Sequence, residues 1–173
     1  GNAQHALRHA KKSHDQDPGF SPGSARYAAL LLNAAQFRKA AAVLEKSWSH
    51  MPHPDFLEPY LTAREAIDSN ARLVAAQRLA KVNPHHSDSH LAVASLALQA
   101  QIWGEARKNL EAILTDKPSA GVCRLMADLA DRAENDAEKS RNWLVRATEA
   151  DPDPAWVCAT CGHVHAEWSE ICG

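Results

Sequence analysis

The sequence has 173 residues and a net charge of −2, a length suited to one compact domain or a short repeat array. Hydrophobic residues make up 45% of the chain but aromatic residues only 6%, so alanine and leucine must supply most of the core. The near-neutral charge excludes the strongly basic character of nucleic-acid-binding domains, and no apolar run approaches the roughly 18 residues of a membrane-spanning helix.

Five of the nine prolines recur at a nearly constant interval of 34, 32, 34 and 34 residues. They are Pro18, Pro52, Pro84, Pro118 and Pro152. Most of the positions twelve and eight residues before each proline are small or apolar, as at Ala40 and Leu44 or Ala106 and Leu110. A spacing of four residues places side chains on one face of a helix, so each of these lattice prolines is expected to end an amphipathic helix.

In chain order, the pattern predicts a single helix at residues 3–14, followed by helix pairs that each end at a lattice proline. First helices are expected at Ser24–Asn33 and Ser89–Gln99. Phe37 and Trp103 occupy equivalent places just before the second helices of these two repeats.

The repeat that ends at Pro84 departs most from the pattern, because it is two residues short and has Arg72 at the small-residue position. A local shift of register to Ala71 and Ala75 would restore its apolar stripe.

This arrangement resembles the tetratricopeptide repeat, whose 34-residue unit carries an A-x3-F…P signature, over about residues 3–152. The resemblance implies an all-α fold, an α-solenoid in which antiparallel helix pairs form a right-handed superhelix. We expect residues 1–152 to be the repeat array, with four full repeats and one N-terminal half repeat, and residues 153–173 to be a separate tail. The partner helix of the half repeat is expected upstream of residue 1.

The first helices of such an array line a concave groove that commonly takes peptides or helices. The positions inferred to face it are mostly apolar or small, without the Lys/Asn/Arg clamp of chaperone-binding members, so we expect an apolar helical segment of a protein partner. They are Ala29, Leu32, Asn33, Ala63, Ile67, Leu91, Ser95, Leu98 and Leu129, together with Ala25, Ala66, Leu125 and Arg132. Alternatively, these residues pack against neighbouring helices or against a terminal helix of the chain itself.

Three of the four cysteines lie in the last sixteen residues, which is typical of a local metal site. Cys158 and Cys161 are separated by two residues and followed by Gly162, a spacing that lets two thiolates bind one ion while glycine allows the turn. Cys172 would be the third thiolate of this rubredoxin-like knuckle.

Three interpretations of the tail stay open. In the first, the fourth ligand lies beyond Gly173, and this chain then binds zinc or iron weakly or not at all. Alternatively, His163 or His165 completes the site, or no metal binds. The remaining cysteine, Cys123, is expected to be a buried small apolar side chain.

The repeats are followed in Asp151–Gly173 by two patterns, W-x-C-x2-C-G and W-x3-C-G. This combination resembles the C-terminal half of the alphaproteobacterial HemY family. They are also similar to the lipopolysaccharide assembly protein B family, which couples such repeats to a rubredoxin-like domain. The first resemblance implies a scaffold in a membrane-tethered protein associated with heme biosynthesis. The array would be on the cytoplasmic side of the bacterial inner membrane, with the anchor outside this chain, and the chain itself soluble.

No sequence pattern indicates an enzyme, since there is no G-x-G-x-x-G and no patterned nucleophile, base and acid. The sequence therefore predicts a non-enzymatic adaptor that binds protein and not nucleic acid. The alternative is a metal-dependent regulatory module in which the cysteine knuckle gates the groove, as in lipopolysaccharide assembly regulators.

Overall fold

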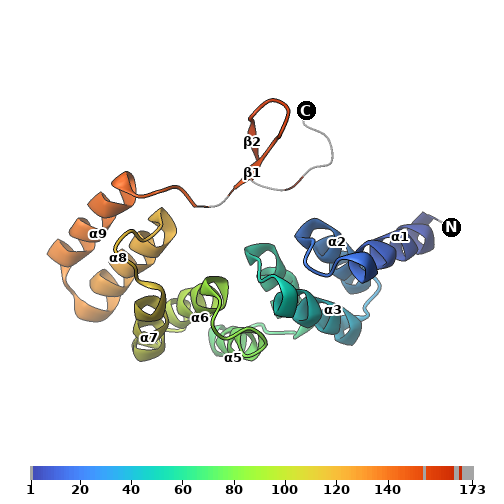
Figure 1. Cartoon of the computed structure of the whole chain (residues 1–173). Helices are drawn as coiled ribbons and strands as arrows, with labels where there is room; N and C mark the ends of the chain where they lie inside the picture. Colours follow the sequence, from blue (N-terminus) through green and yellow to red (C-terminus); the bar gives the residue numbers. More distant parts are fainter. Residues whose placement is uncertain (1, 154, 166–167, 169–173) are drawn as a thin grey trace.

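The computed structural model describes residues 2–153, 155–165 and 168 (Figure 1). Within these residues the chain forms nine α-helices, one 3-10 helix and two short strands. In order they are α1 (Asn2–Gln16), α2 (Ser21–Asn33), α3 (Phe37–His50), η1 (Pro54–Phe56), α4 (Leu57–Ala63), α5 (Ser69–Ala80), α6 (Ser87–Gln99), α7 (Trp103–Ile113), α8 (Ala120–Glu134), α9 (Ala137–Glu149), β1 (Trp156–Val157) and β2 (Val164–His165).

Consecutive helices pack side by side and follow one another along an arc, with the strongest contacts inside the pairs α2–α3, α6–α7 and α8–α9 (Figure 1). Four of the five lattice prolines lie between helices, Pro152 follows the end of α9, and residues 21–150 contain no strand. The prediction of an all-helical repeat array is therefore confirmed, while the right-handed sense of its superhelix stays a prediction.

The small residues of the lattice lie where the two helices of a pair approach each other. Ala40 and Ala106 are fully buried, and so are Leu44 and Leu110 one turn later. A methyl side chain lets the backbones approach closely while the leucines fill the space between repeats. The burial of both alanines agrees with their place on the apolar helix face that the lattice predicts.

Each turn inside a pair contains one residue with left-handed backbone geometry, φ between 52° and 59°: Ala35, Glu65, Gln101 and Asn135. Around them, backbone N–H groups bond back to carbonyls in the last turn of the preceding helix. This satisfies acceptors that a helix end leaves unpaired and reverses the chain within two to five residues.

The repeat that ends at Pro84 is short because its first helix is short. α4 has seven residues, against thirteen in both α2 and α6. Ala76 and Leu79 remain fully buried at their lattice positions, so no shift of register is needed. Arg72 instead turns outward to Glu58 on α4, with Nη2 and Oε1 2.6 Å apart.

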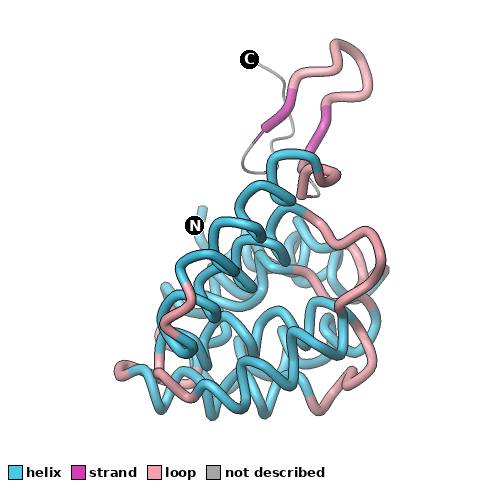
Figure 2. Tube along the Cα trace, turned by 90° about the vertical axis from the view of Figure 1, so that its left-hand side faces the viewer, coloured by secondary structure: helices cyan, strands magenta, loops and turns pink. Residues whose placement is uncertain are grey.

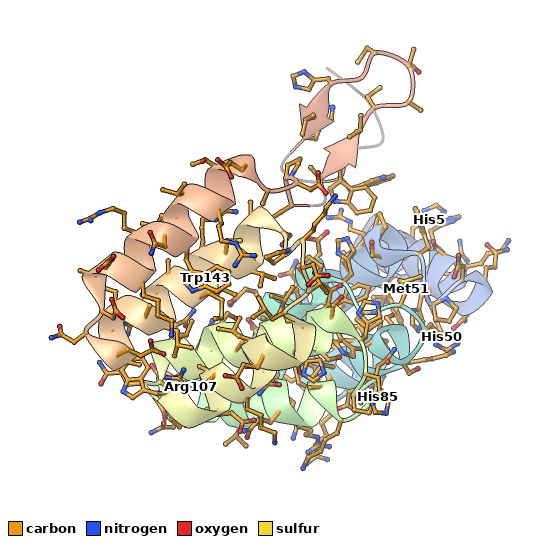
Figure 3. The ribbon with its side chains drawn as sticks, turned by 60° about the vertical axis from the view of Figure 1, so that its left-hand side comes forward. His5, His50, Met51, His85, Arg107 and Trp143 are labelled. Carbon is orange, nitrogen blue, oxygen red and sulfur yellow. The ribbon has the colours of Figure 1, made fainter. Side chains whose placement is uncertain are left out.

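The last helix, α9, has no fully buried residue, unlike the inner helices. Leu144, at a lattice position, is 49% exposed, whereas Trp143 is half-buried against the core (Figure 3). At the same end, Arg107 of α7 pairs with Glu134 of α8 at 2.6 Å. A repeat helix is enclosed only when a neighbour covers its outer face, and among the described residues none covers α9.

After α9 the chain turns back toward the middle of the arc and forms a hairpin on its concave side (Figures 1 and 2). β1 and β2 pair antiparallel, with Trp156 opposite His165 and Val157 opposite Val164.

Candidate partner-binding groove

A cavity of about 1000 Å³ lies between the concave face of the array and the hairpin. Its walls come from α6, α8, the loops around residues 53–57 and 113–119, and the tail. The lining residues are Trp48, His53, Pro54, Asp55, Leu57, Ser87, Asp88, Leu91, Ala92, Ser95, Ile113, Thr115, Lys117, Pro118, Ser119, Val122, Leu125, Asp153, Ala155, Trp156 and His165.

The floor of the cavity is mostly apolar because two first helices present the same kind of face to it. Leu91 and Ser95 are four residues apart on α6, and Val122 and Leu125 are three apart on α8. The floor is held in place by Trp48, whose indole N–H donates to Ser89 Oγ at 2.8 Å and so fixes α6 against α3.

Polar groups gather at one rim of the cavity. His86 caps the start of α6, its Nδ1 accepting from the Asp88 N–H at 3.2 Å, and His53 accepts from the Asp55 N–H in the same way. Burial raises the pKa of the Asp88 carboxyl, while the two nearby imidazoles oppose that shift. This rim therefore offers a partially desolvated acceptor beside two histidines.

The tail forms the opposite wall through specific contacts. The Gly121 N–H donates to Asp153 Oδ1 at 2.8 Å, and Arg124 donates to the other carboxylate oxygen. Trp156 packs against His53 with ring centroids 5.4 Å apart. The tail also reaches the start of α2, where Trp168 meets Phe20 edge-on with centroids 6.0 Å apart.

Of the groove positions inferred from sequence, Leu91, Ser95 and Leu125 line the cavity. Leu98 and Leu129 are each 1% exposed and belong to the core between helices, so they are not accessible to a partner in this structure. Their positions on the first helices face the second helices of the array, which is the packing alternative that the sequence left open.

The other inferred positions lie elsewhere. Ala63 is buried, and Ile67 is 91% exposed in the turn between α4 and α5. Ala29 and Leu32 are half-buried on α2, and Asn33 is exposed at its end; none of them lines the cavity. Of α4, only Leu57 lines the cavity.

The cysteine segment forms the loop of the hairpin. The Gly162 N–H donates to the Cys158 carbonyl and the Cys158 N–H to the His163 carbonyl, both at 2.9 Å. Gly162 has φ of +73°, as the expected tight turn requires. The rings of His163 and His165 lie 4.7 Å apart.

These residues do not complete a metal site within the part of the chain that is described. There, no group of three His, Cys, Asp or Glu side chains is arranged to hold an ion. Cys172 lies outside the described residues, so the three-thiolate set and its fourth ligand stay a prediction. Cys123 is fully buried on α8, as expected for a small apolar side chain.

Sequence reasoning missed the contacts that join the tail to the array, at Gly121, Arg124, Asp153, His53 and Trp156. One signal was available, since Gly121 is the second residue of a helix, where alanine would be favoured. A glycine at such a place is compatible with a close approach by another group, although Gly104 at the same position of α7 has no such neighbour.

No helix among the described residues combines the length and apolar character needed to cross a bilayer. No protein-family model matches the chain.

Among solved structures, the chain is similar to the crystal structure of MamA, with a TM-score of 0.51 and 18% identity over 86% of this chain and 88% of that one. The fold is of the tetratricopeptide type. At this level of identity the similarity describes the fold alone.

A curated relative is "Probable magnetosome protein Mms48" of Magnetospirillum gryphiswaldense (strain DSM 6361 / JCM 21280 / NBRC 15271 / MSR-1), 32% identical over 173 residues. The alignment covers 99% of this chain but only 38% of that protein. These comparisons lend no support to the resemblance to the HemY or lipopolysaccharide assembly families, or to the link with heme biosynthesis.

Proposed function

We propose that this chain is a non-enzymatic protein-interaction scaffold that holds an apolar segment of a partner protein against α6 and α8. The observation that carries the proposal is the cavity of about 1000 Å³ whose floor is Leu91, Ala92, Val122 and Leu125. Pockets of this size and character favour side chains that gain by leaving water. The relative's name supports a setting at the magnetosome, which we extend to this chain as part of the proposal.

The groove is tested by selecting binders from a peptide library against the full chain and mapping them by methyl NMR. Binders are expected to shift the Leu91 and Leu125 methyl signals and to lose affinity for Leu91→Glu. Leu144→Glu is the matched control, because Leu144 is already 49% exposed on α9. The proposed groove would be contradicted by binders that shift methyl signals elsewhere, or by binders whose affinity is unchanged by Leu91→Glu.

The setting is tested by co-sedimentation of the full chain with isolated magnetosomes. Wild type and Leu144→Glu are expected in the pellet and Leu91→Glu in the supernatant. Failure of all three to sediment would remove the magnetosome from the proposal and leave the peptide result unaffected.

A second candidate is a metal-dependent regulatory module, favoured by one observation. The hairpin that carries Cys158 and Cys161 begins at Trp156, which is itself a wall of the cavity. Zinc held by this segment would change access to the groove. Zinc titration of the full chain should then alter peptide affinity, and Cys161→Ser should abolish the change. Equal affinity with zinc and with a chelator would contradict it.

A further inference from the structure

The start of α8 is occupied by the chain's own tail. Asp153 accepts from the Gly121 N–H at 2.8 Å and from Arg124, and the Asp151 carbonyl accepts from the Ala120 N–H at 3.1 Å. The first N–H groups of a helix have no partner inside the helix and attract negative charge. The tail therefore meets two of these donors and one arginine, as a bound peptide would.

Gly121 leaves the room for this contact. A Cβ at that position would lie 2.6 Å from Asp153 Oδ1, closer than such atoms approach. Gly121 has no positive φ that would explain it otherwise. Gly104, the second residue of α7, has no atom within 4 Å of its own would-be Cβ, whereas a Cβ at Gly23 near the start of α2 would lie 2.5 Å from Ser13 Oγ. A close approach is therefore a property of particular helix starts and not of helix starts in general.

Three residues after Asp153, Trp156 makes the second anchor. Its ring packs on His53 at 5.4 Å between centroids. Asp153, Ala155 and Trp156 all line the cavity, and about 1000 Å³ beside them stays open. The tail thus binds the rim without filling the groove.

We infer that the groove recognises an acidic residue followed three positions later by an aromatic one, and that Asp153 and Trp156 are a tethered copy of this motif. The inference rests on the proposed function and names the chemistry of the partner. A partner segment would place its own acid–aromatic pair on Gly121, Arg124 and His53 and its adjoining apolar residues on the cavity floor. Because a tethered segment competes at an effective concentration in the millimolar range, the partner must displace it.

The test uses the full chain and a fluorescent peptide with the sequence of residues 150–157. The peptide is expected to bind Asp153→Asn about tenfold more tightly than wild type, because the substitution weakens the tethered competitor. Adding Gly121→Ala to Asp153→Asn should cost at least about tenfold, since the new methyl group clashes with the incoming carboxylate. The amide signal of Gly121 reports the contact directly by NMR.

The matched control is Gly104→Ala in the Asp153→Asn background, which should bind as Asp153→Asn does. Both glycine substitutions favour helix, so unfolding does not explain a loss of binding. A peptide with asparagine in place of its acidic residue corresponding to Asp153 should lose the affinity.

Three outcomes would overturn the inference. The peptide could bind wild type and Asp153→Asn equally, its affinity for Asp153→Asn could be unchanged by adding Gly121→Ala, or it could bind no variant. Library binders that map to Leu91 and lack the acid–aromatic spacing would also overturn it, while leaving the proposed function intact.

Discussion

The packing of the helices leaves no room for a side chain larger than that of Ala106. This alanine is fully buried at the crossing of α6 and α7. Ala106→Leu is expected to lower the free energy of unfolding by about 1–3 kcal/mol, because the extra carbons force the helices apart. Urea unfolding followed by circular dichroism measures this. Ala112→Leu, at an exposed position of the same helix, should change stability little, and equal stability of the two variants would contradict the repeat register.

His14 is a buried ionisable residue at the junction of α1, α2 and α3. It is 3% exposed, with its Nδ1 2.9 Å from Ser24 Oγ and 3.4 Å from Ser47 Oγ. Burial lowers its pKa, and Lys46 lowers it further; Lys11 and His50 act in the same direction and Asp15 in the opposite one.

The lowered pKa predicts a loss of stability at acid pH. At a pH above the unfolded-state pKa of about 6.5, both states are neutral at His14 and no penalty exists. As the pH falls below that value the unfolded state binds the proton first, so stability declines until the folded pKa is passed. His14→Gln should have a shallower decline between pH 7 and 5 in parallel urea titrations. An unchanged slope would contradict the prediction.

The turns inside the helix pairs hold strain that the sequence could relieve. Gln101 adopts φ of 59°, a conformation that costs a residue with a side chain about 1–2 kcal/mol. Gln101→Gly removes this cost but adds about 0.5–1 kcal/mol of unfolded-chain entropy, so a net gain of up to about 1.5 kcal/mol is expected.

Gln99→Gly is the control for that change, because Gln99 is the last residue of α6 and has ordinary helical geometry. It should destabilise the protein by up to about 1 kcal/mol. A rise in melting temperature for Gln101→Gly beside a fall for Gln99→Gly supports the strained turn. If both variants fall alike, the left-handed residue stores no strain.

The described residues form a continuous helical core, and the described part of the tail does not belong to it. The buried cluster extends from Ala10 to Leu129 and includes no described residue after α9. Trp156→Ala should therefore change the free energy of unfolding by no more than about 0.5 kcal/mol, as measured by urea unfolding of the helical circular dichroism signal. Trp48→Ala, which empties a site with 1% exposure, should cost about 3–5 kcal/mol. A large loss for Trp156→Ala would show that the tail supports the array.

The sequence by itself determined the helices and their stacking. The burial of Ala40, Leu44, Ala106 and Leu110 could be predicted from a 34-residue lattice, because helix periodicity and proline stops are local properties. The same reasoning failed at Leu144, since burial at the end of a stack depends on a neighbour and not on the residue.

Only the tertiary structure decided which surfaces are open to a partner. Leu91 lines the cavity whereas Leu98, on the same helix, is buried, because the exposure of a helix turn depends on which neighbouring elements pack over it. The contact between Asp153 and Gly121 joins residues 32 positions apart. No local pattern specifies such a contact, since it depends on where the tail meets the start of α8 after the helices have packed.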